Sequence, residues 1–212
     1  MLRELIDQFY LDGDKGRDQD HFYITDAGKC PRQVYFKFKK APKKDLDAKT
    51  LRIFDHGNYT HLRIMGTLFS LGLVQGSEIT IPKQEIINGR ADAIISLDNK
   101  PYVIEIKTAS SYKFDSLTQP ESDHLGQIQL YLHFFNIKDG ILIYENKNTQ
   151  ELKEFSIKYD QKLVEELLEN FKKLKEKIDN NIIPEKPTGL EPWRCNYCVY
   201  RKECNKVEKQ NG

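Results

Sequence analysis

Three charged residues in the segment GRADAIISLDNKPYVIEIKTAS, residues 89–110, have types and spacing that could do chemistry: Asp92, Glu105 and Lys107. Glu105 and Lys107 are two residues apart and would share one face of a strand. Two nearby carboxylates repel each other unless a cation sits between them, and hard oxygen ligands select Mg²⁺ or Mn²⁺. Such an ion can activate a water molecule and neutralise charge on a phosphoryl group. Lys107 could then position that water and stabilise the pentacovalent transition state.

The two acids would meet only if the chain turns back tightly between them. The Asp-Asn pair at 98–99 tolerates positive φ, which suits a two-residue turn. Such a turn pairs Leu97 with Lys100, and the same register sets Asp92 opposite Glu105, with Cβ atoms about 5 Å apart. A three-residue turn would shift the pairing by one residue and separate the acids.

A lone Glu-x-Lys triplet is usually part of an exposed strand face that carries a salt bridge. Here the apolar residues at 103, 104 and 106 favour a central strand with a polar cluster at its end. Gly89-x-x-Asp92 together with Glu105-x-Lys107 resembles the motif of the PD-(D/E)XK nucleases.

Two further elements resemble the RecB-like branch of that superfamily: GNYTH, which contains His61, and QIQLY, which contains Gln127 and Tyr131. Alone, His61 would be a surface or packing residue and Tyr131 a core residue, but their order and spacing around the acid pair reverse that interpretation. The resemblance implies that the metal is bound by His61, Asp92, Glu105 and the main-chain carbonyl of Ile106. It also implies that Gln127 and Tyr131, i and i+4 on a helix, line the DNA path beside Lys107.

The four cysteines form a second candidate site. Cys30 stands alone, whereas Cys195, Cys198 and Cys204 are closely spaced near the end of the sequence. From the spacing alone, zinc is favoured over iron–sulfur, and a disulfide framework is disfavoured. The sequence C-P-R-x-x-Y before the core and C-x-Y-C-x-Y-R-x-x-C after it resemble the iron–sulfur staple of RecB-like exonucleases. Within that branch, the motifs resemble the fourth-numbered CRISPR-associated (Cas) exonuclease and its phage-borne relatives, and this resemblance implies a [4Fe–4S] cluster.

Other residues near these motifs have weaker assignments. His124 is a candidate DNA contact, and His56 and His133 are interpreted as surface or packing residues. Glu78 could be an acid that supports the site, although solvation at a strand edge is the favoured interpretation. Candidate lining residues of the DNA path are Arg32, Tyr35, Phe36, Lys37, Tyr197, Tyr200 and Arg201.

Helices and strands that could position these residues are visible in the hydrophobic pattern. Helices are expected at residues 2–11, 24–38 (with Thr25 or Asp26 as N-cap), 50–72, 123–135 and 161–180. Strands are expected at residues 78–81, 91–97, 102–108, 139–146 and 151–159. Helices, a mostly antiparallel run of strands and a crossover helix make an α/β sandwich.

The resemblance implies a PD-(D/E)XK, restriction-endonuclease-like core, with a mixed, mainly antiparallel sheet flanked by helices. An iron–sulfur staple would join the N- and C-terminal segments. We therefore expect a single nuclease domain over 1–212, in which 1–50 and 182–212 form an iron–sulfur subdomain around the core 51–181.

Composition limits the class of protein. The chain has 212 residues, 31% of them charged and 39% hydrophobic, as in soluble globular proteins. The net charge is +1, so any basic surface for nucleic acid must be local. No apolar run reaches the roughly 20 residues of a membrane span, and no signal peptide is visible. We expect a cytoplasmic protein with reduced cysteines.

The expected activity is that of a Mg²⁺- or Mn²⁺-dependent DNA exonuclease on single-stranded DNA or single-stranded ends, with 5′→3′ polarity. The setting would be recombination, repair or CRISPR spacer processing. Expected partners are mainly single-stranded DNA, with CRISPR adaptation or phage recombination proteins and self-association left open. The alternatives are a zinc-bearing, non-catalytic DNA-binding module and a partner-dependent subunit of a CRISPR adaptation complex.

Overall fold

The computed structural model describes residues 1–13, 19–189 and 192–210. The chain divides into two compact units, each built from segments that are distant in sequence. The first unit comprises Met1–His21, Lys29–Asp55 and Glu169–Gly212, and the second comprises Phe22–Gly28 and His56–Leu168. All the candidate metal-binding and catalytic residues belong to the second unit, and all four cysteines belong to the first.

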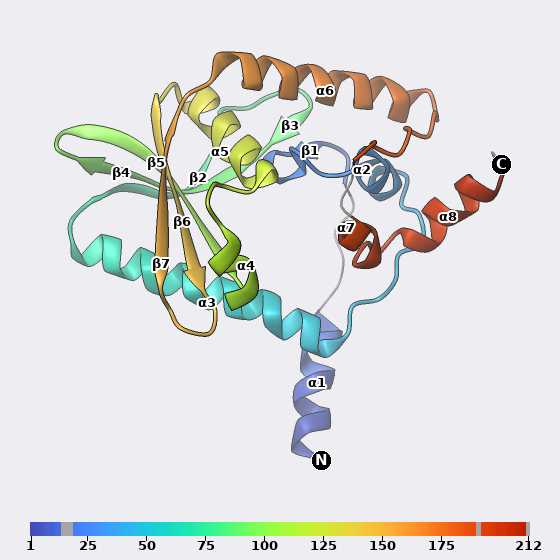
Figure 1. Cartoon of the computed structure of the whole chain (residues 1–212), viewed down its shortest axis with the longest axis horizontal. Helices are drawn as coiled ribbons and strands as arrows, with labels where there is room; N and C mark the ends of the chain where they lie inside the picture. The colour runs from blue at the N-terminus through green and yellow to red at the C-terminus, as the bar shows by residue number, and fades with distance from the viewer. Residues whose placement is uncertain (14–18, 190–191, 211–212) are drawn as a thin grey trace. The chain divides into compact units, whose positions relative to one another are not determined.

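The second unit is built on a five-stranded sheet in the order β2-β4-β5-β6-β7 (Figure 1). The strands are β2 (Val74–Thr80), β4 (Arg90–Leu97), β5 (Lys100–Ala109), β6 (Asp139–Asn146) and β7 (Leu152–Lys158). Only the central pair β5–β6 is parallel, and the other neighbours are antiparallel. Helices α4 (Ser111–Ser116) and α5 (Ser122–Phe135) form the crossover between β5 and β6. The expected mixed, mainly antiparallel sheet flanked by helices is confirmed.

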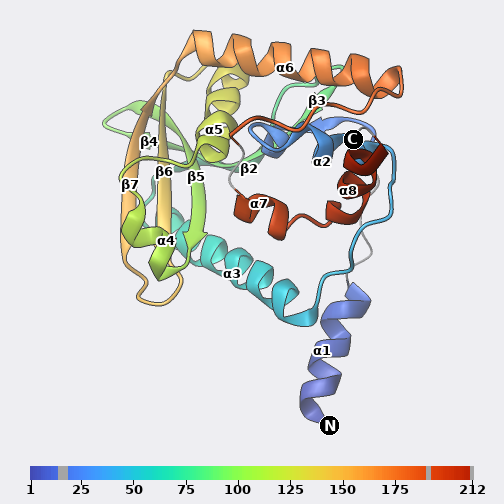
Figure 2. The same cartoon turned by 45° about the vertical axis from the view of Figure 1, so that its right-hand side comes forward.

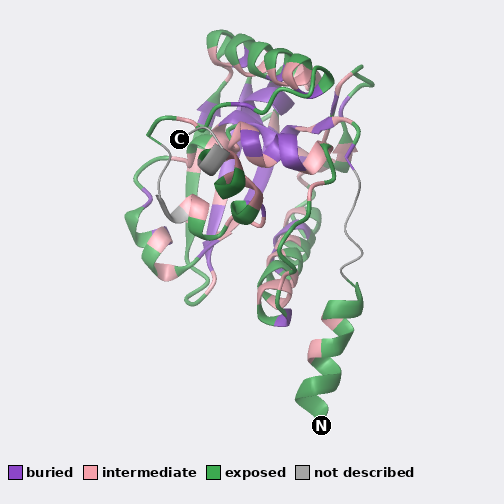
Figure 3. Cartoon of the chain, turned by 90° about the vertical axis from the view of Figure 1, so that its right-hand side faces the viewer, coloured by how far each residue is buried: buried purple, intermediate pink, exposed green. Residues whose placement is uncertain are grey.

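Side chains on β5 alternate between two covered faces of the sheet. Ile104 and Ile106 pack in a core cluster with Ile64 and Met65 from α3 (Ala48–Ser70). Fully burying one such aliphatic side chain contributes about 1.5–3 kcal/mol. Glu105 points to the opposite face, where α5 lies. Figure 3 shows that buried residues concentrate in this sheet and in α5.

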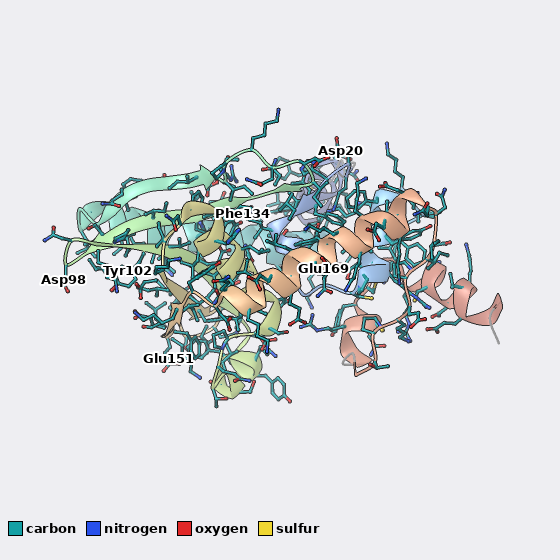
Figure 4. The ribbon with its side chains drawn as sticks, turned by 90° about the horizontal axis from the view of Figure 1, so that it is seen from above. Asp20, Asp98, Tyr102, Phe134, Glu151 and Glu169 are labelled. Carbon is teal, nitrogen blue, oxygen red and sulfur yellow. The ribbon has the colours of Figure 1, made fainter. Side chains whose placement is uncertain are left out.

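The β4–β5 hairpin has the predicted two-residue turn. Asp98 and Asn99 both adopt positive φ, 50° and 62°, as a type I′ turn requires. Leu97 pairs with Lys100, and the register continues without a shift. Asp98 lies at the tip of this hairpin (Figure 4). One step beyond the pair Ala93–Ile104, the same register sets Asp92 opposite Glu105.

The second expected helix differs from the prediction. Residues 24–38 are not one helix but a short 3₁₀ turn at Ile24–Asp26 followed by α2 (Pro31–Phe38), which has Cys30 as N-cap. Gly28 interrupts the expected helix. Its φ is 73°, and a Cβ added at this position would lie only 2.9 Å from the Cα of Asp123. Thr25 and Asp26 therefore do not cap α2. A two-residue parallel pair, β1 (Phe22–Tyr23) with β3 (Ile87–Asn88), was not predicted because two residues show no periodicity.

The first unit joins segments from both ends of the chain. It contains α1 (Leu2–Gly13), α2, the start of α3, most of α6 (Gln161–Asp179), α7 (Pro192–Asn196) and α8 (Arg201–Gln210). The amide of Lys44 donates to the Val199 carbonyl over 2.9 Å, and the rings of Phe36 and Tyr200 lie 6.1 Å apart. Figure 2 shows α2, α7 and α8 close together. None of the described helices is long and apolar enough to cross a membrane.

Candidate active site

Asp92 is fixed to the neighbouring strand through one carboxylate oxygen. Its Oδ2 accepts a 2.7 Å hydrogen bond from the backbone N–H of Ile106. The other oxygen, Oδ1, lies 3.1 Å from Nε2 of His61 on α3. Strand pairing therefore sets the position of this acid, and one oxygen stays directed toward the histidine.

Glu105 is deeply buried, and only one of its two carboxylate oxygens has hydrogen-bond partners. Its residue is 3% exposed, and its Oε1 accepts from Lys107 Nζ and from Gln127 Nε2, both at 2.7 Å. Its Oε2 is buried with no hydrogen-bond partner. Burial raises the pKa of the Glu105 carboxyl to about 7; the Lys107 cation opposes this rise and the Asp92 carboxylate adds to it. A cation that approaches the unpaired oxygen would stabilise the ionised form of this carboxyl group.

His61 faces the same cluster. Its close contact with Asp92 is the main reason that its pKa is raised, against the opposing effect of burial. Nε2 is nevertheless buried without a well-directed hydrogen bond, although it lies within ion-pair distance of Asp92. A nitrogen lone pair that faces no hydrogen-bond donor is free to bind a metal.

These residues fit a divalent cation. Ligand atoms of His61, Glu78 and Asp92 all lie within 4.8 Å of one another. Glu105, whose Oε2 has no hydrogen-bond partner, lies opposite Asp92 on the neighbouring strand. One imidazole with several carboxylates is a donor set that Mg²⁺ and Mn²⁺ accept. The amide of Ile106 is engaged by Asp92, and the ligand role of its carbonyl oxygen stays a prediction.

Comparison with known proteins identifies the family to which this site belongs. The model of the PD-(D/E)XK nuclease superfamily matches residues 24–205. The chain belongs to that superfamily. The CRISPR-associated exonuclease Cas4 of Saccharolobus solfataricus is 29% identical over an alignment of 204 residues. The match covers 89% of this chain and 89% of that protein.

Solved structures agree with this assignment. SSO0001 is 25% identical and covers 96% of both chains, with a TM-score of 0.64. LHK-Exo, an alkaline exonuclease from Laribacter hongkongensis, is 10% identical and has a TM-score of 0.58. That match covers 82% of this chain and 94% of LHK-Exo, so it shows a shared PD-(D/E)XK fold.

Gln127 and Tyr131 on α5 both reach the site region and are buried there. Gln127 is 5% exposed; its amide nitrogen donates to Glu105, and its Oε1 accepts from Lys107 Nζ over 2.8 Å. Tyr131 is 1% exposed, and its hydroxyl donates to the carbonyl of Arg90 over 2.8 Å. Gln127 thus contacts two charged groups of the site and Tyr131 a backbone carbonyl beside it, and their part in lining a DNA path stays a prediction.

Glu78, which the sequence suggested only as a possible supporting acid, lies at the site. The flanking pairs Ser77–Ala93 and Ile79–Ala91 set Glu78 opposite Asp92 across β2 and β4. The hydrophobic pattern located this strand but contained no signal for its register, because a long connection separates β2 from β4. His124, a candidate DNA contact, instead has its Nδ1 2.8 Å from the Tyr144 hydroxyl.

The four cysteines of the first unit come into one neighbourhood. Burial raises the pKa of the Cys198 thiol, and the charges of Cys30, Cys204 and Cys195 raise it further. Arg32 donates from Nη1 to the Cys204 sulfur over 3.3 Å. Within the described part of the chain, however, no three of the four sulfurs lie within 4.8 Å of one another.

Several predicted lining residues near the cysteines face the interior of this unit. The buried ones are Arg32, Tyr35, Phe36 and Tyr200, all between 6% and 8% exposed. Arg32 also donates from Nε to the Pro184 carbonyl over 2.8 Å, which makes it a structural contact. Tyr197 is 82% exposed and Arg201 is also exposed, so these two remain available to a ligand.

Proposed function

We propose that this protein is a Mg²⁺- or Mn²⁺-dependent DNA exonuclease that acts on single-stranded DNA or single-stranded ends in the 5′→3′ direction. The observation that carries the proposal is the unpaired, buried Oε2 of Glu105, in a residue that faces Asp92 across a hairpin and is bonded to Lys107. Membership of the nuclease superfamily and similarity to a protein named as an exonuclease support the same activity.

In this proposal, His61, Asp92, Glu105 and the carbonyl of Ile106 would hold the ion. When bound, the ion would lower the pKa of a water molecule and offset negative charge on the scissile phosphate. Asp92 is pre-positioned for this role by its bond to the Ile106 amide, so little reorganisation is needed on binding.

Lys107 would supply the second positive charge. Its ammonium is held between Glu105 Oε1 and Gln127 Oε1, at 2.7 and 2.8 Å. From there it could orient the attacking water and stabilise the charge that develops on the phosphoryl oxygens. Gln127 would keep both Lys107 and Glu105 in place through its two polar atoms.

We also propose that the four cysteines bind a [4Fe–4S] cluster that staples the ends of the chain. Four thiolates can bind either a tetrahedral zinc ion or an iron–sulfur cluster. The resemblance of the cysteine-bearing segments to an iron–sulfur staple supports the cluster. The N–H group that Arg32 directs at Cys204 would stabilise a thiolate ligand.

A role in CRISPR spacer processing, alone or within an adaptation complex, is the favoured biological setting. The similarity to the CRISPR-associated exonuclease Cas4 supports it. Trimming of single-stranded overhangs would use the metal site described above and would start from the free end of the strand.

The decisive experiment follows the release of acid-soluble nucleotides from end-labelled single strands with Mg²⁺, Mn²⁺ or EDTA. We expect metal-dependent release by the wild type and loss in Lys107→Ala. With a 3′ label, 5′→3′ digestion gives a ladder of shortening labelled products, whereas a 5′ label is released at once. Cutting of closed circular single strands would show that a free end is not required, and full activity in EDTA would contradict the metal requirement.

A further inference from the structure

Glu78 lies at the edge of the cluster that the metal would occupy. It is on β2, opposite Asp92 in the strand register, and its Oε1 is 3.8 Å from His61 Nε2. The three side chains offer ligand atoms that all lie within 4.8 Å of one another. One metal ion at bonding distance from all three would require only small side-chain adjustments.

The two oxygens of Glu78 have different surroundings. Oε2 accepts from Nη2 of Arg90 at 2.6 Å, whereas Oε1 is the oxygen nearest to His61. The backbone carbonyl of Arg90 in turn accepts from the buried Tyr131 hydroxyl. The carboxylate of Glu78 is therefore anchored on one side and open on the other, which is how supporting contacts orient a metal ligand.

A second observation is that two polar atoms at the cluster have no hydrogen-bond partner. Oε2 of Glu105 and Nε2 of His61 are both buried without a hydrogen-bond partner, and Glu105 is 3% exposed. Oε1 of Glu78 lies 3.8 Å from Nε2 of His61, so Glu78 reaches one of these unpaired atoms. Lys107 and Arg90 are already paired with Glu105 and Glu78.

The backbone at Glu78 is also unusual. Its φ is 52°, in the left-handed region, although it lies inside a strand and is not a glycine. Non-glycine residues with this φ are uncommon and tend to cluster at functional sites. The pairing of β2 with β4 is also irregular just before it, between Val74 and Gly76.

We propose that Glu78 is a further ligand of the divalent cation through Oε1, and that Arg90 orients it by holding Oε2. This inference rests on the proposed function, because it adds a residue to the site formed by His61, Asp92 and Glu105. A third carboxylate strengthens the binding of a hard ion and increases the preference for Mg²⁺ and Mn²⁺ over softer metals.

The test measures Mn²⁺ binding to the full-length protein without DNA, by the loss of the free-ion signal in electron paramagnetic resonance. Glu78→Gln should raise the Kd for Mn²⁺ by about 10-fold or more, the scale seen when a metal site loses an important partner. Glu85→Gln is the matched control, since Glu85 is exposed in the same unit and the variant changes the net charge equally. Thermal unfolding confirms that each variant is folded.

A double variant separates ligation from electrostatics. Glu78→Gln alone leaves Arg90 unpaired near the site, and this charge could repel the ion. Glu78→Gln with Arg90→Gln restores the wild-type net charge, so the loss of affinity should persist if Glu78 is a ligand. Recovery of wild-type affinity in the double variant would overturn the proposal, as would unchanged affinity in Glu78→Gln.

Asp92→Asn distinguishes this inference from the proposed function. If Asp92→Asn loses Mn²⁺ and Glu78→Gln does not, only the role of Glu78 is wrong. If the wild type binds no Mn²⁺, or if Asp92→Asn binds it normally, the metal site of the proposed function fails and the role of Glu78 fails with it.

Discussion

Lys107 donates a 2.8 Å hydrogen bond to Gln127 Oε1, and both side chains donate to the same oxygen of Glu105. The three groups form a closed triangle, so none of them can rotate without breaking two contacts. The remaining oxygen of Glu105 is left free of protein partners. The geometry thus separates a positioned ammonium from a buried carboxylate oxygen that has no hydrogen-bond partner.

Loss of the ammonium should stop the chemistry more than the binding. Lys107→Ala should lower the rate of single-strand digestion by at least ~100-fold, the scale of losing one central electrostatic group. DNA affinity, measured by fluorescence anisotropy in Ca²⁺, should fall much less. Lys113→Ala, which removes an equal charge from α4, is the control and should remain active. A Lys107→Ala protein with full activity in Mg²⁺ and in Mn²⁺ would refute the assignment.

Gln127 should matter for rate in a way that a neighbouring glutamine does not. Gln127→Ala frees Lys107 and Glu105 from a shared partner and should lower the rate about 10–100-fold. Gln129 is equally buried on α5, but it bonds to the Lys158 carbonyl and the Asp160 amide. Gln129→Ala should therefore lower the melting temperature and leave the rate per folded molecule close to wild type. Equal rate losses in the two variants would mean that Gln127 acts only through folding.

Metal-free protein should become less stable as pH rises through the titration range of Glu105. Burial raises the pKa of this carboxyl from its usual 4.5 to about 7, so between these values the folded state binds more protons than the unfolded state. Stability linked to Glu105 is therefore present below pH 4.5 and lost as pH approaches 7.

Melting temperatures in EDTA check this sign. The difference between Glu105→Gln and wild type should grow in favour of the variant from about pH 5 to pH 7 and then level off. Mn²⁺ affinity of the wild type should rise over the same range, because the ion competes with the proton. A difference that is constant with pH would show that Glu105 is ionised throughout.

The cysteines should affect folding and activity together. Joining Cys30 to Cys204 through one cluster closes a loop of almost the whole chain, and removing such a link costs several kcal/mol by the cross-link estimate, on the order of 4–5. Cys198→Ala should lower the melting temperature, remove a broad absorbance band near ~400 nm and reduce nuclease activity. Lys202→Ala, exposed on the adjacent α8, should change none of these. A Cys198→Ala protein with unchanged melting temperature and rate would contradict the staple.

The sequence alone was sufficient for the part of the site that depends on local structure. Asp98 and Asn99 favour a two-residue turn, and that turn determines the register of the whole hairpin. Strand alternation then places Glu105 and Lys107 on one face. Helical spacing likewise predicts that Gln127 and Tyr131 share a face, and both reach the site region.

Contacts between distant segments required the tertiary structure. Glu78 meets Asp92 because β2 pairs with β4, and no short turn between them encodes that register. The resemblance implied that Tyr131 lines the DNA path, and Arg32 was a candidate for the same role. Only the tertiary structure shows that both are buried and bonded to the carbonyls of Arg90 and Pro184. Residue type and spacing thus determined which groups could do chemistry. Long-range packing decided where these groups lie and how deeply each is buried, because burial and strand pairing between remote segments depend on the whole fold.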